Sequence, residues 1–230
     1  MLPGIYFNTG AGIVRQKELA VITQNLSNAM TPGYKKERIA FSRYYLTVIE
    51  RIKTDFSQGD ITHTGNPFDV AICENERAFF VVRTPEGIFY TRRGDFSLSR
   101  EKKLITRNGF FVQGQKGDIV IKGSQITITE DGRIIADGKT VDKIKIVELP
   151  LDKVERYGRT LFRLKGNIRP KESESFKIMQ GYLELSNVRP VEEVARMISC
   201  LRNYEISQKS IQSQDEMTSK LINEVGSVRI

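Results

Sequence analysis

The segments IYFNTGAGIVRQKELAVITQNLSNA (residues 5–29) and PVEEVARMISCLRNYEISQKSIQSQDEMTSKLINEV (residues 190–225) lie near opposite ends of the chain and share the spacing of an amphipathic helix. In the first segment an apolar or small residue recurs every seven positions, at Ile5, Gly12, Leu19 and Leu26, with Ile22 and Ala29 at the alternate position. In the second segment the two heptad positions hold Val194, Leu201 and Ile222, and Met197 or Ile198, Tyr204, Ile211 and Val225. Each apolar stripe covers one side of its helix, so neither helix can bury that side alone. We therefore expect the two ends of the chain to pair.

Two interpretations of these helices are open. In the first they form an assembly seam, whose members are Ile5, Leu19, Ile22, Leu26, Val194, Ile198, Leu201, Tyr204 and Ile211. In the second they are ordinary amphipathic helices on a globular core, and the same residues pack only within the chain. Arg15, Gln208 and Asp215 interrupt the stripes, which is not typical of a self-sufficient coiled coil. Terminal amphipathic helices that lack a partner often order only on association, which favours the assembly seam and loosely held ends in the free monomer.

Local signals set the limits of both helices. Thr31-Pro32-Gly33 should end the first helix, because the residue before proline is disfavoured in the α region. The last helix should begin between Asn187 and Pro190, with Asn187 as a possible cap and with Glu192 and Glu193 near the positive end of the helix dipole. Residues 34–60 fit either a short helix or an extended arm.

A change from helical to alternating periodicity begins near Ile61. NPFDVAI, AFFVVRT and IFYTRR have strand character, and Pro85-Glu86-Gly87 between the last two predicts a hairpin. Further short strands separated by Gly, Asn and Asp follow up to about residue 180. The sequence therefore predicts an α+β fold, in which a mostly antiparallel β domain is inserted between N- and C-terminal helices that form a discontinuous, coiled-coil-like domain. We place an N-terminal helix and arm at 1–60, the β domain at 61–180 and the C-terminal helix at 181–230.

Composition excludes several classes of protein. With 39% hydrophobic residues and no apolar run of about 18, no membrane insertion is expected. The N-terminus lacks the basic and apolar regions of a cleaved secretory signal. His63 is the single histidine, and Cys73 and Cys200 have no CxxC spacing, so we expect no metal or cofactor site and two free thiols, although a disulfide between them is possible.

Enzyme motifs are also missing. No GxSxG or P-loop is present, and Gly10 and Gly12 lie within the helical stripe rather than after a strand. Asp95 and Asp131 occur in turn contexts, where carboxylates satisfy backbone amides. We expect no catalytic activity.

The net charge of +8 leaves nucleic acid, acidic lipid and acidic protein as partners. Residues 77–107 are locally basic and contain aromatic residues that could stack bases on a sheet, namely Phe79, Phe80, Phe89, Tyr90 and Phe96. These aromatics also occupy positions that a core would use, and a solvated basic face is the simpler interpretation. Nucleic-acid binding is therefore the alternative from a different class, and we expect no nucleic-acid partner.

Three stretches resemble the family of flagellar rod and hook axial proteins. The first is an Asn-rich helix end with a Thr-x-Gly-aromatic-Lys motif, formed here by Asn25, Asn28, Thr31, Gly33, Tyr34 and Lys35. The second, from NPFDVAI to NGFFVQG, is similar to the central β domain of that family. The third, GYLELSNVRPVEEVARMISCLRNYEISQKSIQSQDEM, is similar to its C-terminal helix, with Ser186, Asn187 and Val188 at the start and Arg202, Tyr204 and Glu205 within it. Gln24 and Ser27 depart from the family pattern, which usually has Asn and Ala at these positions.

The resemblance implies a structural subunit of the bacterial flagellar basal-body rod. Its length and simple middle are most like the proximal rod type, with a distal rod or hook protein as the alternative. Family members polymerise into a tube that spans the periplasm, and they leave the cell through the flagellar type III export apparatus without a cleaved signal peptide. Expected partners are copies of this chain, other rod and hook-family subunits and the export apparatus.

Overall fold

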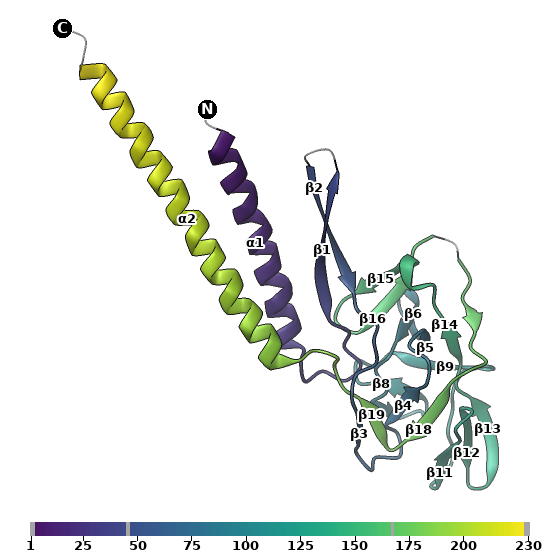
Figure 1. Ribbon diagram of the computed structural model, residues 1–230. Helices are drawn as coiled ribbons and strands as arrows, with labels where there is room; N and C mark the ends of the chain where they lie inside the picture. Colours follow the sequence, from purple (N-terminus) through teal and green to yellow (C-terminus); the bar gives the residue numbers. More distant parts are fainter. Residues whose placement is uncertain (1–2, 45–46, 167, 228–230) are drawn as a thin grey trace. The chain divides into compact units, whose positions relative to one another are not determined.

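The structure is a computed structural model that describes residues 3–44, 47–166 and 168–227, and it omits the side chains of 3–12, 41–44, 47–50 and 224–227. It confirms an α+β fold with antiparallel sheets and with one helix near each end of the chain (Figure 1). Contacts divide the chain into two compact units. The helical unit comprises Met1–Ser27, Glu37–Lys53 and Arg189–Ile230, and the β unit comprises Asn28–Lys36 and Thr54–Val188.

The helical unit consists of two helices and a hairpin. Helix α1 (Pro3–Ser27) and helix α2 (Pro190–Ser227) lie side by side and run in opposite directions (Figure 1). Strand β1 (Glu37–Tyr44) pairs with β2 (Thr47–Thr54), so the extended interpretation of residues 34–60 holds for this segment. Helix α1 also packs against β1 and therefore has two covered faces.

The helix ends agree with the local sequence signals. α1 stops at Ser27 because the chain turns at Asn28, whose carbonyl accepts the amide of Thr31 at 3.0 Å. α2 starts at Pro190, where the missing amide proton of proline is tolerated and its fixed φ suits the first turn.

In the β unit, short antiparallel strands form several small sheets around a larger one. The larger sheet has the order β15 (Val154–Tyr157), β16 (Leu161–Leu164), β6 (Gly87–Thr91), β5 (Ala78–Thr84), β9 (Phe111–Gly114), β8 (Leu104–Thr106) and β7 (Phe96–Leu98). On its sides β10 (Gly117–Asp118) pairs with β9, and β14 (Ile146–Glu148) pairs with β5 and with β17 (Lys171–Glu172). The smaller sheets are β11 (Ile126–Ile128), β12 (Arg133–Ala136) and β13 (Lys139–Lys143); β18 (Lys177–Gln180) with β4 (Val70–Cys73); and β19 (Tyr182–Glu184) with β3 (Ile61–His63). A 3-10 turn, Leu151–Lys153, precedes β15.

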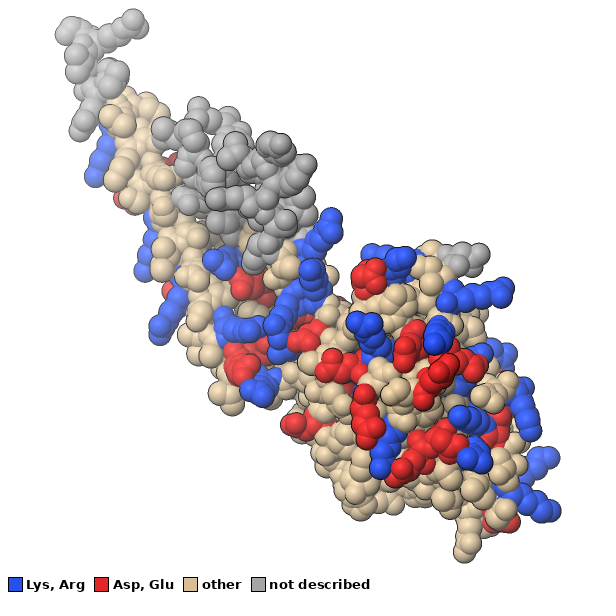
Figure 2. All heavy atoms as spheres, turned by 45° about the vertical axis from the view of Figure 1, so that its right-hand side comes forward, with Lys and Arg blue, Asp and Glu red and all other residues tan. Residues whose placement is uncertain are grey.

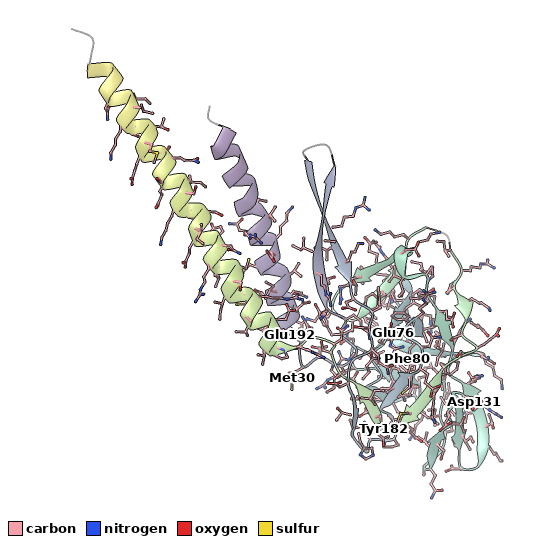
Figure 3. The ribbon with its side chains drawn as sticks, viewed as in Figure 1. Met30, Glu76, Phe80, Asp131, Tyr182 and Glu192 are labelled. Carbon is pink, nitrogen blue, oxygen red and sulfur yellow. The ribbon has the colours of Figure 1, made fainter. Side chains whose placement is uncertain are left out.

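Strand β5 lies at the centre of the β unit and is buried on both faces. Phe80 and Val82 point into one apolar cluster, together with residues of β4, β8 and β12. Phe79 and Val81 point into a second cluster that contains Phe56 and Phe162. Each fully buried side chain of this kind stabilises the fold by roughly 1.5–3 kcal/mol. The interior position of Phe80 can be followed in Figure 3.

The β unit is wider than the segment 61–180 that the sequence indicated. It also takes in Asn28–Lys36, Thr54–Asp60 and the residues from 181 to Val188. These flanking segments belong to it because they contribute a strand, β19, and buried side chains such as Tyr34 and Phe56. Alternation of apolar residues could not reveal them, since they are short and rich in polar residues.

Candidate functional site

The face of α2 that packs on α1 mixes polar and apolar side chains. The less exposed side chains of the helix recur every three or four residues, with Ser210 beside them, at Glu193, Met197, Cys200, Tyr204, Ser207, Ile211, Gln214 and Thr218. Two contacts show that this line faces α1: the Asn25 Nδ2 donates to Glu193 Oε2 at 3.3 Å, and the Cys200 thiol donates to the Arg15 carbonyl at 3.4 Å. We call this line the inner seam.

A second, apolar line on α2 is left exposed. Val191, Val194, Ile198 and Leu201 have 83%, 42%, 49% and 41% of their surface exposed. We call these four residues the outer stripe. Val194, Ile198 and Leu201 of the outer stripe each follow directly after a residue of the inner seam, so the apolar stripe lies beside the face that meets α1.

The expected pairing of Val194, Ile198 and Leu201 with the N-terminal helix is therefore not what the structure shows. α2 is turned by one residue, which rotates it by about 100°. Tyr204 and Ile211, which the sequence also placed in the seam, do lie half-buried in the inner seam. Hydrophobic spacing alone selected the most apolar line, whereas the structure uses a line that contains specific polar partners.

The residues expected on α1 lie at or near its covered surfaces. Ile22 is buried at 4% exposure, and Leu19 and Leu26 are half-buried. The side chain of Ile5 lies outside the part of the chain whose side chains are described.

Asn25, the first residue of the sequence motif, joins three elements of the helical unit. Its amide nitrogen donates to the Glu37 carbonyl at 2.8 Å, and its oxygen accepts the Glu37 amide at 2.9 Å. The same nitrogen reaches the Glu193 carboxylate on α2. Asn25 and Glu193 are each 1% exposed.

The rest of the N-terminal motif forms a tight turn in the β unit. Asn28 is buried, and its side-chain oxygen accepts the Thr31 hydroxyl at 3.3 Å. Gly33 has a φ of +66°, and a Cβ there would lie 2.5 Å from the Arg93 nitrogen. Only glycine combines this left-handed backbone with so close an approach. Tyr34, fully buried, has the Arg156 guanidinium 4.6 Å above its ring.

Lys35 enters a buried charge cluster, which we call the ion triad. Its ammonium donates to Glu184 Oε1 at 2.5 Å and to the Ser57 carbonyl at 2.7 Å. Arg92 Nε donates to the other oxygen of Glu184 at 2.8 Å. The side chains of Lys35, Arg92 and Glu184 are all 0% exposed. The triad thus ties the segment after α1 and the segment before α2 to the centre of the β unit.

The triad is well supplied with hydrogen bonds. The Arg92 guanidinium also donates to the carbonyls of Ile72, Asn75 and Ala78, at 2.7 to 3.0 Å. Desolvation lowers the pKa of Lys35, and the opposing attraction of Glu184 offsets part of this effect. Buried charges of this kind are tolerated only when they are paired and fully hydrogen-bonded.

Asn187 does not cap α2. Its side-chain oxygen accepts the Lys36 amide at 2.7 Å, and its nitrogen donates to the carbonyls of Asp55 and Ser57 at 2.9 and 3.1 Å. It therefore fastens the same two flanking segments that the triad joins. The other residues of the C-terminal motif divide between the two units: Ser186 and Val188 are buried in the β unit, and Arg202 and Glu205 are exposed on α2.

Sequence reasoning missed Glu184 and Arg92. Glu184 occupies the last position of an alternating strand, and Arg92 belongs to a basic stretch that has the composition of a solvated face. The one available signal was Lys35 in the motif, a lysine between an aromatic residue and the buried segment that follows.

The basic stretch 77–107 does not form a platform for bases. Its five aromatic residues, Phe79, Phe80, Phe89, Tyr90 and Phe96, have at most 8% of their surface exposed and belong to the two apolar clusters. Arg92 is in the triad, and Arg93 is paired with Asp95. Figure 2 shows basic and acidic side chains interspersed over the face of the β unit that it presents. The stacking surface that the nucleic-acid alternative needs is therefore absent at these residues.

Three further features concern the part of the chain that the structure describes: its thiols, its metal-ligating side chains and the apolar character of its helices. Cys73 and Cys200 are both free and buried. Among the described residues no group of three or more His, Cys, Asp or Glu side chains is placed to hold a metal ion. Neither described helix combines the length and apolar character needed to cross a membrane.

Comparison with known proteins places these features in a family context. Residues 179–224 match the family model described as flagellar basal body rod FlgEFG protein C-terminal, and residues 75–136 match the flagellar hook protein FlgE/F/G D1 domain. The chain is 31% identical to flagellar basal-body rod protein FlgF of Salmonella typhimurium, over 92% of this chain and 94% of that protein. It is 29% identical to flagellar basal-body rod protein FlgG of Buchnera aphidicola from Schizaphis graminum, over 96% and 99% of the two chains. It is 27% identical to flagellar hook-basal body complex protein FlhO of Bacillus subtilis, over 99% and 100%.

Proposed function

Because the chain belongs to the family of flagellar basal-body rod proteins, we propose that it is a structural subunit of the flagellar rod that polymerises through its terminal helices. The rod would be a passive drive shaft across the periplasm, and this subunit would act by packing rather than by catalysis. Copies of the chain and other rod and hook-family subunits are the partners.

The observation that carries this proposal is the outer stripe. Four aliphatic side chains lie in a row on α2, and three of them keep 41–49% of their surface exposed although α1 already packs on the helix. Further along the same helix Ile206, Met217, Leu221 and Ile222 are 61–66% exposed. These four residues lie on other sides of the helix than the outer stripe, so the stripe alone forms a row of exposed apolar side chains of the kind that is typical of a protein–protein interface.

A terminal helix of a neighbouring subunit is the occupant that fits this surface. The residues of the stripe are spaced three and four apart, which is the spacing at which one helix packs on another. Each neighbour of the same family would bring its own terminal helices. A contact between two different surfaces of identical or related chains builds a helical filament when the rotation from one subunit to the next does not close into a ring. The coiled-coil character expected from the sequence is part of this proposal.

The rod subclass of the protein and its route of export are proposed from its resemblance to the flagellar axial family. We take the chain to be of the proximal rod type, with a distal rod or hook protein as the alternative, and we take it to be exported by the flagellar type III apparatus without signal cleavage. Periplasmic assembly in the basal body is the corresponding location.

Electron microscopy of basal bodies tests the function. Deletion of the gene in the source organism should leave basal bodies with a truncated rod and should abolish motility. Intact basal bodies with a hook in the deletion strain would contradict the proposal.

A set of variants tests the surface. Val194→Gln, Ile198→Gln and Leu201→Gln together should leave a folded chain that fails to restore the rod, because Gln keeps helix propensity but removes the apolar stripe. The matched control is Lys209→Gln, Glu216→Gln and Lys220→Gln on the same helix, all at exposed positions, which should restore motility. Full restoration by the stripe variant would remove the outer stripe from the interface.

A further inference from the structure

We infer that the buried pair Asn25–Glu193 is a register pin: it determines which face of α2 meets α1 and so keeps the outer stripe free. The first half of this inference concerns the isolated chain. The second half, that the freed stripe serves a neighbouring subunit, rests on the proposed function.

The geometry fixes α2 in rotation and along its axis. Glu193 is in the first turn of α2, and its carboxylate meets the Asn25 amide at 3.3 Å within the seam. Asn25 is itself held by two hydrogen bonds to the backbone of Glu37, so the amide group cannot follow a displaced carboxylate. Arg196 lies 3.5 Å from the second oxygen of Glu193 and is half exposed.

Apolar burial alone would favour another packing. Turning α2 by one residue would bring Val194, Ile198 and Leu201 onto α1 in place of Glu193, Met197 and Cys200. That exchange would bury more apolar surface, at roughly 25 cal/mol per Å². It would also leave the Asn25 amide, already buried, without its partner on α2, and a broken buried polar contact costs about 1–3 kcal/mol.

The polar pair is thus the contact that opposes the more apolar packing. A single buried Asn in a helical seam can fix register and partner number in the same way, at some loss of stability. A cavity of about 240 Å³ beside the pair, lined by both residues and by Glu18, Glu37 and Arg38, shows that this part of the seam is not closely packed. The Asn25–Glu193 pair therefore contributes to the choice of which face of α2 meets α1 rather than to close packing.

A second contact provides a way to measure the register. The Cys200 sulfur lies 3.8 Å from Glu18 Oε2. In a Cys73→Ala background, Glu18→Cys should form a disulfide with Cys200 under mild oxidation, because both positions face each other in the native rotation. When Asn25→Leu and Glu193→Leu are added, we expect the yield of this disulfide to fall at least fivefold.

Exposure of the outer stripe gives an independent readout. In a Cys73→Ala, Cys200→Ala background, Ile198→Cys should react rapidly with a maleimide, since position 198 is 49% exposed. The two leucine substitutions should slow this reaction about tenfold, as residue 198 turns towards α1. Helicity measured by circular dichroism should stay unchanged, because one apolar packing replaces another.

Two controls separate the pin from general effects. Gln24→Leu with Glu192→Leu adds the same apolar groups at exposed neighbouring positions and should change neither readout. Glu193→Gln keeps a hydrogen-bond acceptor for Asn25 without the charge and should retain the native disulfide.

The inference is overturned if the double leucine variant keeps the native disulfide and labelling rate, if it loses helicity, or if the Gln24/Glu192 control changes the register equally. Both readouts come from the monomer, so they are independent of whether the chain builds a rod. Conversely, a deletion strain with an intact rod would refute the proposed function and leave the register result standing.

Discussion

The helical unit and the β unit use polar side chains in opposite ways. In the β unit two apolar clusters surround β5, and the ion triad is sealed among backbone carbonyls at 0% exposure. In the helical unit polar residues such as Asn25 and Glu193 lie within the helix contact beside apolar ones, and the apolar stripe of α2 is exposed. The difference teaches that the β unit buries its apolar side chains within one chain, whereas the helical unit leaves the outer stripe of α2 exposed.

Two truncations would break this comparison most directly. Removing residues 1–27 deletes α1 but leaves the whole β unit, so its cooperative thermal transition should remain. Removing residues 1–36 also deletes buried Tyr34 and Lys35, and the loss of a buried aromatic residue and of one partner in a buried ion cluster should together lower the unfolding free energy by more than about 5 kcal/mol. Calorimetry distinguishes the two, and equal stability of both fragments would contradict the assignment of 28–36 to the β unit.

Removal of the triad's only anion should have the next largest effect. Glu184→Gln leaves the buried Lys35 and Arg92 without a counter-charge, and we expect a loss of about 3–5 kcal/mol in the free energy of unfolding by urea. Glu172→Gln, which removes an exposed carboxylate 4.0 Å from Lys145, is the control and should change stability by less than about 0.5 kcal/mol. A similar response of the two variants would mean that the triad is not the charge cluster described.

Two glycine substitutions test the close backbone approach in the turn at Gly33. Gly33→Ala and Gly158→Ala both force alanine into a left-handed backbone, which costs about 1–2 kcal/mol. At Gly33 the new Cβ also meets backbone atoms at 2.5 Å, whereas at Gly158 nothing lies within 4 Å. Chemical denaturation should therefore show a clearly larger loss for Gly33→Ala, and equal losses would show that the close approach is unimportant.

Lys35 should make the stability of the β unit depend on pH in the alkaline range. Its pKa is lowered in the folded state by desolvation, so between that pKa and the ordinary value of 10.5 the unfolded chain binds more protons than the folded chain. Stability therefore rises with pH through this window. Comparison with Lys35→Met isolates the effect: the stability of the native chain relative to the variant should increase as the pH approaches 10.5, and a constant difference would contradict the lowered pKa.

The smallest predicted effect is at Asp131, in the turn between β11 and β12 (Figure 3). Hydrogen bonds from Thr129 and Arg133 lower its pKa from 3.8 to about 2. The stability that this carboxylate contributes is present above pH 4 and is lost as the pH falls through about 2. The side chain is 42% exposed, so the change should stay below about 1 kcal/mol. Acid titration of Asp131→Asn should show a flatter stability profile, and a profile like that of the native chain would refute the assignment.

Much of the architecture could be predicted from local pattern. The turn Pro85-Glu86-Gly87 between AFFVVRT and IFYTRR indicated two strands, and the burial of the first on both faces follows from the five consecutive apolar residues in Ala78–Val82. Thr31-Pro32-Gly33 and Pro190 marked the helix limits within a few residues. These features depend on neighbours in the sequence, so sequence reasoning reaches them.

The rotation of α2 could not be predicted in the same way. Val194, Ile198 and Leu201 form the most apolar line on the predicted helix. The local pattern does not indicate that Glu193 is buried against Asn25, because the two residues are 168 positions apart in the chain. The triad is a similar case, since Lys35 and Glu184 are separated by 149 residues. Asn187 looked like a helix cap but fastens Lys36 and Asp55 instead.

The amino-acid sequence alone determined which segments become helix and which become strand, and three ordered motifs within it indicated the family. Only the tertiary structure decided which side chains are enclosed: the pairing of Asn25 with Glu193, the ion triad and the exposure of the outer stripe. The physical reason is that propensity and periodicity act between near neighbours along the chain. The burial of a charge or an amide depends instead on whether a distant segment brings the matching partner.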